Sequence, residues 1–118
     1  MLRSLVELAR PKHWIKNVFI LMPVPFALAS GANLDPGRFL MGLIAFCAAN
    51  SAIYALNDAF DSEADRLHPT KCHRPVASGR VSVASALWLS GCLAVISILL
   101  TAAIRIPTTV PIVLAYMI

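Results

Sequence analysis

The segment 57–65, NDAFDSEAD, contains four of the six acidic residues of the chain. On a helix, where each residue turns about 100°, four of its oxygen-bearing side chains fall within roughly one quadrant: Asn57, Asp58, Asp61 and Asp65. Glu63 falls on the other side. One face therefore gathers three carboxylates and a carboxamide, which are ligands for a hard cation.

Close carboxylates repel one another, and a divalent cation removes that cost. Mg²⁺ is held in proteins by one or two carboxylates, with waters and substrate phosphates completing its shell. The pattern therefore fits a Mg²⁺–diphosphate site, with Asp58 and Asp61 as the catalytic candidates. By itself the pattern fits a solvated acidic helix end equally well, because clustered charges are only probabilistic markers of a site.

Basic residues lie close to this acidic motif. Arginine binds phosphoryl oxygens as a bidentate fork, and lysine binds them as a mobile point charge. The candidate substrate-binding residues are Arg66, Lys71 and Arg74, which follow the motif, and Lys12 and Lys16 near the N-terminus. Salt bridges or membrane-topology signals would explain the same cations without a substrate. Carboxylates for a metal beside cations for phosphate nevertheless favour a pocket that binds a diphosphate.

The composition indicates an integral membrane protein. The chain of 118 residues is 58% hydrophobic and only 14% charged, against about a quarter charged in ordinary soluble domains. Its net charge of +4 comes from basic residues that flank apolar runs. That placement follows the positive-inside rule of membrane proteins better than it fits nucleic-acid binding.

We expect an all-α, multi-spanning transmembrane bundle with three full spans and the start of a fourth. The spans run over about 18–32, 39–56 and 83–103, separated by turns at 33–38 and 105–111 and by the polar segment 57–82. Pro23 and Pro25 should bend the first span. A long basic stretch and these prolines favour a retained helix over a cleaved signal peptide. Asn50, inside the second span, needs a polar partner within the protein.

The distribution of Lys and Arg predicts the orientation. Four lie in 1–16 and four in 57–82, but only Arg38 and Arg105 lie in the two other connections. The positive-inside rule then places the N-terminus and the acidic motif together on the cytoplasmic side of a bacterial plasma membrane. We treat 1–118 as the N-terminal part of one membrane domain, with 57–82 as a cytoplasmic loop and helix extension.

The motif resembles a known family. NDAFDSEAD has the form N-D-x-x-D-x-x-x-D and looks like the first aspartate-rich motif of the UbiA superfamily of intramembrane prenyltransferases, and RPVASG (74–79) is similar to that family's continuation. RPKHWIKN (10–17) and DRLHPTKCHRP (65–75) look like the decaprenyl-phosphate phosphoribosyltransferase branch.

That resemblance implies Mg²⁺-dependent transfer of 5-phosphoribosyl from phosphoribosyl diphosphate to a polyprenyl phosphate, in arabinan precursor synthesis for the cell envelope. It implies that Asn57, Asp58, Asp61 and Asp65 serve the metal and diphosphate. The acceptor phosphate is already anionic, so no general base is required. Two alternatives stay open: a prenyltransferase that moves an isoprenyl chain to an aromatic or other acceptor, and a non-catalytic membrane subunit that binds cations.

The chain departs from the family pattern in one respect. The family has about nine spans and a second aspartate-rich motif, whereas no Asp or Glu follows Asp65 here. We therefore expect an N-terminal fragment, or one piece of a split enzyme, that needs the remaining half and is inactive alone.

Overall fold

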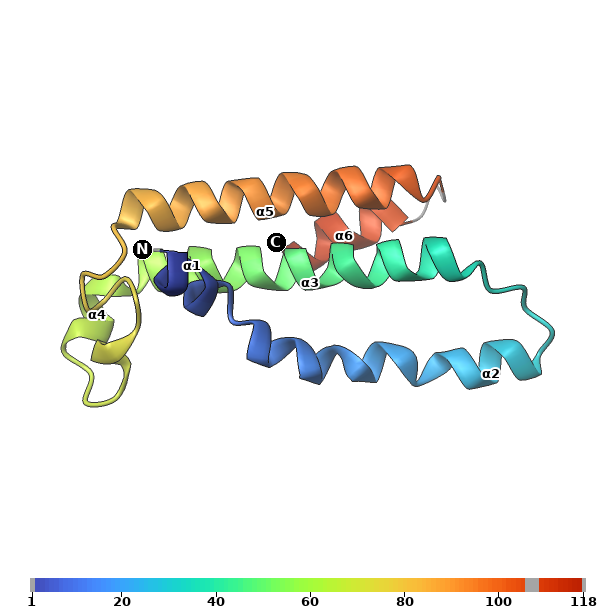
Figure 1. Cartoon of the computed structure of the whole chain (residues 1–118), viewed down its shortest axis with the longest axis horizontal. Coiled ribbons are helices and arrows are strands. Elements are labelled where there is room, and N and C mark those ends of the chain that lie inside the picture. The colour runs from blue at the N-terminus through green and yellow to red at the C-terminus, as the bar shows by residue number, and fades with distance from the viewer. Residues whose placement is uncertain (1, 106–108, 118) are drawn as a thin grey trace.

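In the computed structural model the described residues, 2–105 and 109–117, form helices and turns without strands. Two long helices dominate: α3 (Pro36–Phe60) and α5 (Val83–Ala103) lie side by side and antiparallel (Figure 1). Both are long and apolar enough to cross a membrane. This confirms two apolar helices of spanning length where the second and third spans were predicted, and the bounds of α5 are those expected; the crossings themselves and the total number of spans stay predictions.

Small residues bring α3 and α5 into close contact. Ala45 and Ala52 of α3 are buried. Their carbonyl groups accept hydrogen bonds of 2.8 Å from the Ser97 and Ser90 hydroxyls of α5. Side chains of this size allow close backbone approach between membrane helices, and hydroxyl-to-carbonyl bonds add to the attraction. The α3–α5 pair is therefore a rigid scaffold for the residues at its two ends.

The N-terminal residues form a broken rod rather than one bent span. After α1 (Leu2–Ala9) come the 3₁₀-helix η1 (Pro11–Leu21) and α2 (Pro23–Ala29). The break before Pro23 has a simple cause: this proline lacks the N–H that would bond the Phe19 carbonyl in an α-helix. Met22 N donates to that carbonyl instead, at 3.2 Å.

Helix α3 begins earlier than the sequence suggested. We expected a turn over 33–38, but the helix starts at Pro36, with Asp35 as its N-cap. The Asp35 Oδ1 accepts hydrogen bonds from the amides of Gly37 at 2.9 Å and Arg38 at 3.2 Å. Asp-Pro is therefore the start of a helix here, since aspartate suits the N-cap and proline the first helical position.

The polar connection between α3 and α5 is also partly helical. It contains α4 (Ser62–Arg66) and the short 3₁₀-helix η2 (Lys71–His73). A small core fastens it to the helices and to α1: the buried residues are Leu8, Ala55, Ala59, Val76, Val81 and Ala86. Figure 1 shows this connection and α1 at the same end of the α3–α5 pair.

Helix α6 (Thr109–Met117) packs against the main pair. Its Tyr116 donates a hydrogen bond to the Asn50 side chain, and the Tyr116 ring lies 4.9 Å from that of Phe46, centroid to centroid. The expectation that Asn50 has a polar partner is confirmed. The turn expected over 105–111 was too long, because helix α6 begins at Thr109. Residues 106–108 lie outside the described part of the chain.

Candidate active site

Two buried carboxylates form the centre of the candidate site. Asp58 lies in the last turn of α3 and is 2% exposed, and Asp65 lies on α4 and is 3% exposed. The backbone links their helices, because Asp61 N donates to Asn57 O and Asp65 N donates to Asp61 O, each at 2.8 Å. The helical spacing assumed for the motif thus continues across the junction between α3 and α4.

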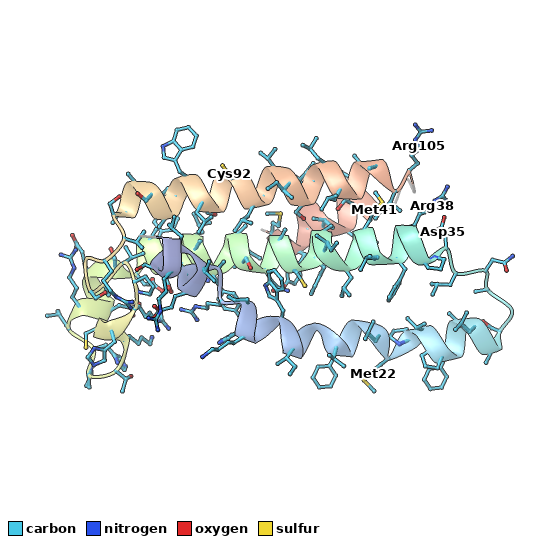
Figure 2. All side chains as sticks on the ribbon, in the orientation of Figure 1. Met22, Asp35, Arg38, Met41, Cys92 and Arg105 are labelled. Atoms are coloured by element: carbon cyan, nitrogen blue, oxygen red, sulfur yellow. The ribbon has the colours of Figure 1, made fainter. Side chains whose placement is uncertain are left out.

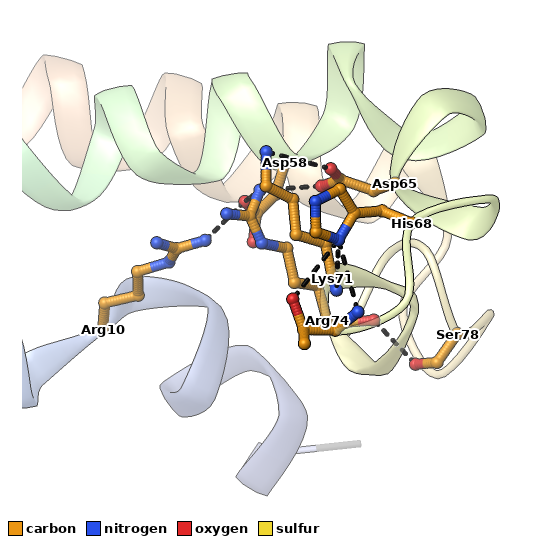
Figure 3. Close-up of polar contacts among 8 residues, drawn as sticks. Arg10, Asp58, Asp65, His68, Lys71, Arg74 and Ser78 are labelled. Atoms are coloured by element: carbon orange, nitrogen blue, oxygen red, sulfur yellow. Dashed lines mark hydrogen bonds and ion pairs between the residues drawn. The ribbon is translucent and has the colours of Figure 1, made fainter.

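Three cations approach these carboxylates from two directions (Figure 3). The Arg10 Nη2 donates to Asp58 Oδ1 at 2.6 Å. The Arg74 Nη1 donates to Asp58 Oδ1 at 3.2 Å and to Asp65 Oδ2 at 2.7 Å. Lys71 Nζ lies 3.8 Å from Asp65 Oδ1. Charge-assisted bonds of this kind are about twice as strong as neutral ones, so the network holds both carboxylates in place.

The backbone at the junction between α1 and η1 positions Arg10. This residue, between α1 and η1, has φ 50° and ψ 52°, in the left-handed region, which costs a non-glycine residue of the order of 1 kcal/mol. Ser51 of α3 holds the junction: its Oγ donates to Ala9 O at 2.6 Å and accepts from Trp14 Nε1 at 3.0 Å. The Arg10 guanidinium also lies 4.9 Å from the Tyr54 ring centroid, a favourable cation–π distance.

Local contacts in the RPVASG segment position Arg74. The Ser78 Oγ donates to Arg74 O at 2.8 Å, and Val76 and Ala77 are buried. Gly79 has φ 77°, a conformation that favours glycine. The motif therefore turns the chain so that its arginine faces the acids of α3 and α4.

His68 supports the same loop. Its Nδ1 accepts from the backbone amides of Thr70 at 3.2 Å and Lys71 at 3.4 Å (Figure 3). The imidazole therefore shapes the turn that carries Lys71.

A second ion pair fastens α1 to the end of this loop. The two Arg80 Nη atoms donate to the Glu7 carboxylate at 2.7 and 3.1 Å. Arg80 also donates to His73 O at 2.7 Å and to Ser78 Oγ at 3.1 Å. The hydrogen bond from Arg80 lowers the pKa of Glu7 below its ordinary value. This bidentate pair connects segments 73 residues apart and closes the site on one side.

The structure brings together only part of the predicted set. Asn57 and Asp61 are exposed, as is Arg66. Among the predicted cations, Lys71 and Arg74 contact the carboxylates directly. The side chain of Lys16 lies outside the described residues.

A cavity of about 700 Å³ opens between α1, η1 and the loop, a size typical of ligand sites. Its polar and charged lining includes Arg3, Glu7, Arg10, Lys12, His13 and Asp58, and Arg74 faces it from the loop. Arg10 and His13 were not predicted as site residues, although both lie in the RPKH stretch that carried the resemblance.

The residues fit a magnesium ion that is bound jointly with a phosphate ligand. Asp58 Oδ1 is taken by two arginines, but Asp58 Oδ2 is buried and has no hydrogen-bond partner within the described residues. A buried carboxylate oxygen without a partner is costly, and a cation would satisfy it. No group of three His, Cys, Asp or Glu side chains, among those described, could hold a metal by itself. Mg²⁺ is held in proteins by one or two carboxylates and takes further oxygens from phosphates, so the fit rests on Asp58 together with a phosphate ligand.

Comparison with known proteins identifies the family of this sequence. Residues 17–118 match the UbiA prenyltransferase family. A decaprenyl-phosphate phosphoribosyltransferase of Mycolicibacterium smegmatis is 40% identical over 105 residues, which is 86% of this chain and 33% of that protein. Nodulation protein NoeC of Azorhizobium caulinodans is 37% identical over 92 residues, 78% of this chain and 29% of that protein.

A third relative has a different activity in its name. A protoheme IX farnesyltransferase of Synechococcus sp. JA-2-3B'a(2-13) is 35% identical over 94 residues, 80% of this chain and 28% of that protein. The chain thus spans about a third of the length of these curated relatives. The matched range and the identities show that the chain belongs to the UbiA prenyltransferase family, whose members are integral membrane proteins.

Proposed function

We propose that this chain forms the donor-binding part of a Mg²⁺-dependent transferase, which moves 5-phosphoribosyl from phosphoribosyl diphosphate to a polyprenyl phosphate such as decaprenyl phosphate. The observation that carries the proposal is Asp58: a buried carboxylate with one oxygen held by two arginines and the other oxygen without a hydrogen-bond partner among the described residues. It lines a cavity rich in cations, and the similarity to decaprenyl-phosphate phosphoribosyltransferases supports the choice of donor.

The basic residues would bind the phosphates. Arg74 and Lys71 lie beside the carboxylates on the loop side, and Lys12 lines the cavity from η1. Arg66 and Lys16 are further candidates from the sequence. A guanidinium that now bonds Asp58 can turn toward a diphosphate oxygen, because arginine offers five N–H donors in a planar fork. These cations would hold the diphosphate and stabilise the charge it gains as it leaves.

In the transfer itself, the bond from the ribose anomeric carbon to the diphosphate breaks and a bond to the acceptor phosphate oxygen forms. The acceptor oxygen is already anionic near neutral pH, so no side chain has to remove a proton. Asp58, which lines the cavity, would hold Mg²⁺, and the ion would neutralise the charge of the leaving diphosphate. Asp65, Asn57 and Asp61 are further ligand candidates from the sequence; Asp65 is paired with Arg74, and Asn57 and Asp61 are exposed. Diphosphate leaves as the second product.

The proposal places this reaction at the cytoplasmic face of a bacterial plasma membrane, in supply of cell-envelope arabinan. The second acidic ligand set that the family resemblance implies would come from the remaining half of the enzyme. In keeping with that expectation, the 118-residue chain should be inactive alone.

A second candidate function is isoprenyl transfer from an isoprenyl diphosphate to an aromatic or other acceptor. The 35% identity to a protoheme IX farnesyltransferase favours it, and a Mg²⁺–diphosphate site would serve it equally. The two functions differ in the group attached to the diphosphate, so a choice of donors can separate them.

The decisive experiment uses the full-length protein in membranes. Labelled phosphoribosyl diphosphate, decaprenyl phosphate and Mg²⁺ should yield a lipid-extractable phosphoribosyl product, and a chelator should abolish it. A parallel reaction offers farnesyl diphosphate with an aromatic acceptor. Product in the second reaction alone would replace the first proposal by the second, and product in neither would overturn both.

A further inference from the structure

His13 contributes a second unsatisfied atom to the same cavity. Within the described residues, two buried side-chain polar atoms lack a hydrogen-bond partner: Asp58 Oδ2 and His13 Nδ1. Both side chains line the 700 Å³ cavity. A buried polar atom without a partner costs free energy, and two such atoms on side chains that line one cavity favour a ligand that satisfies both.

The Tyr54 ring fixes the position of this imidazole. The His13 and Tyr54 rings meet edge to face, with centroids 5.3 Å apart and an interplanar angle of 78°. Tyr54 and Asp58 are four residues apart on α3, so they share a face and are separated by about 6 Å along the helix axis. The imidazole is therefore held about one helical turn from the carboxylate that would carry the metal and the diphosphate.

The group bound to the diphosphate distinguishes the two candidate donors at this place. An isoprenyl diphosphate presents hydrocarbon next to its diphosphate, and hydrocarbon would leave His13 Nδ1 unsatisfied. Phosphoribosyl diphosphate presents ribose hydroxyls, and a hydroxyl can donate to or accept from either tautomer of a neutral imidazole. A site built to bond a hydroxyl rejects an analogue that lacks it far more strongly than an apolar pocket can discriminate by shape.

Building on the proposed function, we propose that His13 is a specificity-determining residue whose imidazole hydrogen-bonds a ribose hydroxyl of the bound donor. The role belongs to binding rather than to the chemical step. His13 would then set the preference for a phosphoribosyl donor over an isoprenyl donor, while the cations and Asp58 would bind the diphosphate that both donors share.

The test compares two ligands on one protein. Dissociation constants for phosphoribosyl diphosphate and for inorganic diphosphate are measured by calorimetry with Mg²⁺ on the purified full-length protein. His13→Phe keeps an aromatic ring against Tyr54 but removes both nitrogens. It should weaken phosphoribosyl diphosphate about 10- to 100-fold, the range for loss of one hydrogen bond that leaves a buried partner, and it should leave inorganic diphosphate within about twofold.

His73→Phe is the matched control, because His73 lines the same cavity and is exposed; it should change both dissociation constants by the same factor, whereas His13→Phe should change only that for phosphoribosyl diphosphate. Donor analogues that lack the 2- or the 3-hydroxyl sharpen the test. One of these analogues should bind the wild-type protein as weakly as phosphoribosyl diphosphate binds His13→Phe. The affinity of that analogue should not fall further in His13→Phe. His13→Asn, which keeps a hydrogen-bonding group, should restore part of the affinity and serves if the Phe variant does not fold.

Other outcomes would overturn the inference, and one would also overturn the proposed function. An equal loss for both ligands would show a purely structural His13, and no loss for either would show that it does not contact the ribose; both results overturn the inference. If wild type transfers phosphoribosyl while His13→Phe and His13→Asn bind the donor normally, only this inference fails. If wild type binds inorganic diphosphate but not phosphoribosyl diphosphate, the proposed function fails as well.

Discussion

The two ends of α3 carry the same residue types in different surroundings. At one end Asp35 and Arg38 form a 3.4 Å ion pair, with side chains 57% and 58% exposed. At the other end Asp58, 2% exposed, is bonded by Arg10 at 2.6 Å and by Arg74 at 3.2 Å. Figure 2 shows Asp35, Arg38 and Arg105 together at the end remote from the acidic loop. The exposed aspartate caps a helix, whereas the buried one faces a cavity.

The difference shows that burial and unsatisfied atoms, rather than residue type, separate a site from a surface. An exposed pair is screened by water and contributes little. A buried pair must be compensated by hydrogen bonds, and Asp58 Oδ2 and His13 Nδ1 have no such bond from the part of the chain that the structure describes. Substitutions at the two ends should therefore have very different effects.

The largest effect is expected from Asp58→Asn. Removal of the charge leaves Arg10 and Arg74 beside a neutral amide and weakens the hold on the metal, so transfer should fall about 100- to 1,000-fold. Initial rates of transfer in membranes measure this loss, and thermal stability in detergent checks that the variant is folded. Asp35→Asn is the matched control, and equal losses in the two variants would contradict the contrast between the ends.

Arg10→Met should have the next largest effect. Methionine keeps the apolar stem of the side chain but removes the guanidinium and its charge-assisted bond to Asp58, so kcat/KM should fall about 10- to 100-fold. Arg3→Met, at an exposed cation of the same cavity, provides the comparison and should cost less. A larger loss at Arg3 than at Arg10 would show that the phosphate is bound farther from Asp58.

Glu7→Gln should have a modest, pH-dependent effect on α1. The hydrogen bond from Arg80 lowers the pKa of Glu7 below its ordinary 4.5, so the pair stabilises docking above that pH and is lost as the pH falls through the lowered pKa. Hydrogen exchange of the α1 amides, corrected for intrinsic rates, should be about two- to fivefold faster in the variant at pH 7.

The difference in exchange rate between wild type and Glu7→Gln should disappear at acidic pH. Wild type should approach the exchange rate of Glu7→Gln as the pH falls through the lowered pKa of Glu7, since the protonated carboxyl no longer pairs with Arg80. Arg80→Gln should reproduce the variant at pH 7. Equal exchange rates in wild type and Glu7→Gln at pH 7 would count against the role of this pair.

Substitution of Asp35 should have the smallest effect on activity. Asn is as good an N-cap as Asp, so Asp35→Asn should leave transfer within about twofold, and Asp35→Ala should cost only about 1 kcal/mol of helix stability. Thermal unfolding and transfer rates of the two variants measure this. A large loss of transfer in Asp35→Asn would indicate a function at this end as well.

Much of this architecture could be predicted from local patterns. The apolar run of α5 and the helical spacing of the acidic motif are local signals, and the structure confirms both. The burial of Asp58 and Asp65 beside exposed Asn57 and Asp61 could not be predicted, because it depends on α1 and the RPVASG segment packing against α3. A helical wheel assigns a direction to each side chain but does not say what covers it.

Long-range pairing explains the residues that were missed. Arg10 meets Asp58 across 48 positions, and its left-handed backbone has no glycine or asparagine to signal it. The prolines at 23 and 25 did signal a disturbance in the first apolar segment, but a bend and a change to 3₁₀-helix have the same sequence signature. Asp35-Pro36 was ambiguous in the same way, since a turn and a helix start use the same residues.

The wide sequence separation of the α1 contacts has a consequence for biosynthesis. Leu8, Arg10 and Glu7 find their partners among residues 55–86. At about 5–20 residues per second, the ribosome needs roughly 4–15 s after making Glu7 to reach Arg80. During that interval the N-terminal helix lacks the part of its docking surface that Val76, Arg80 and Val81 provide, and the membrane interface is the natural place for its apolar side. The complete cavity can therefore form only after the loop has been synthesised.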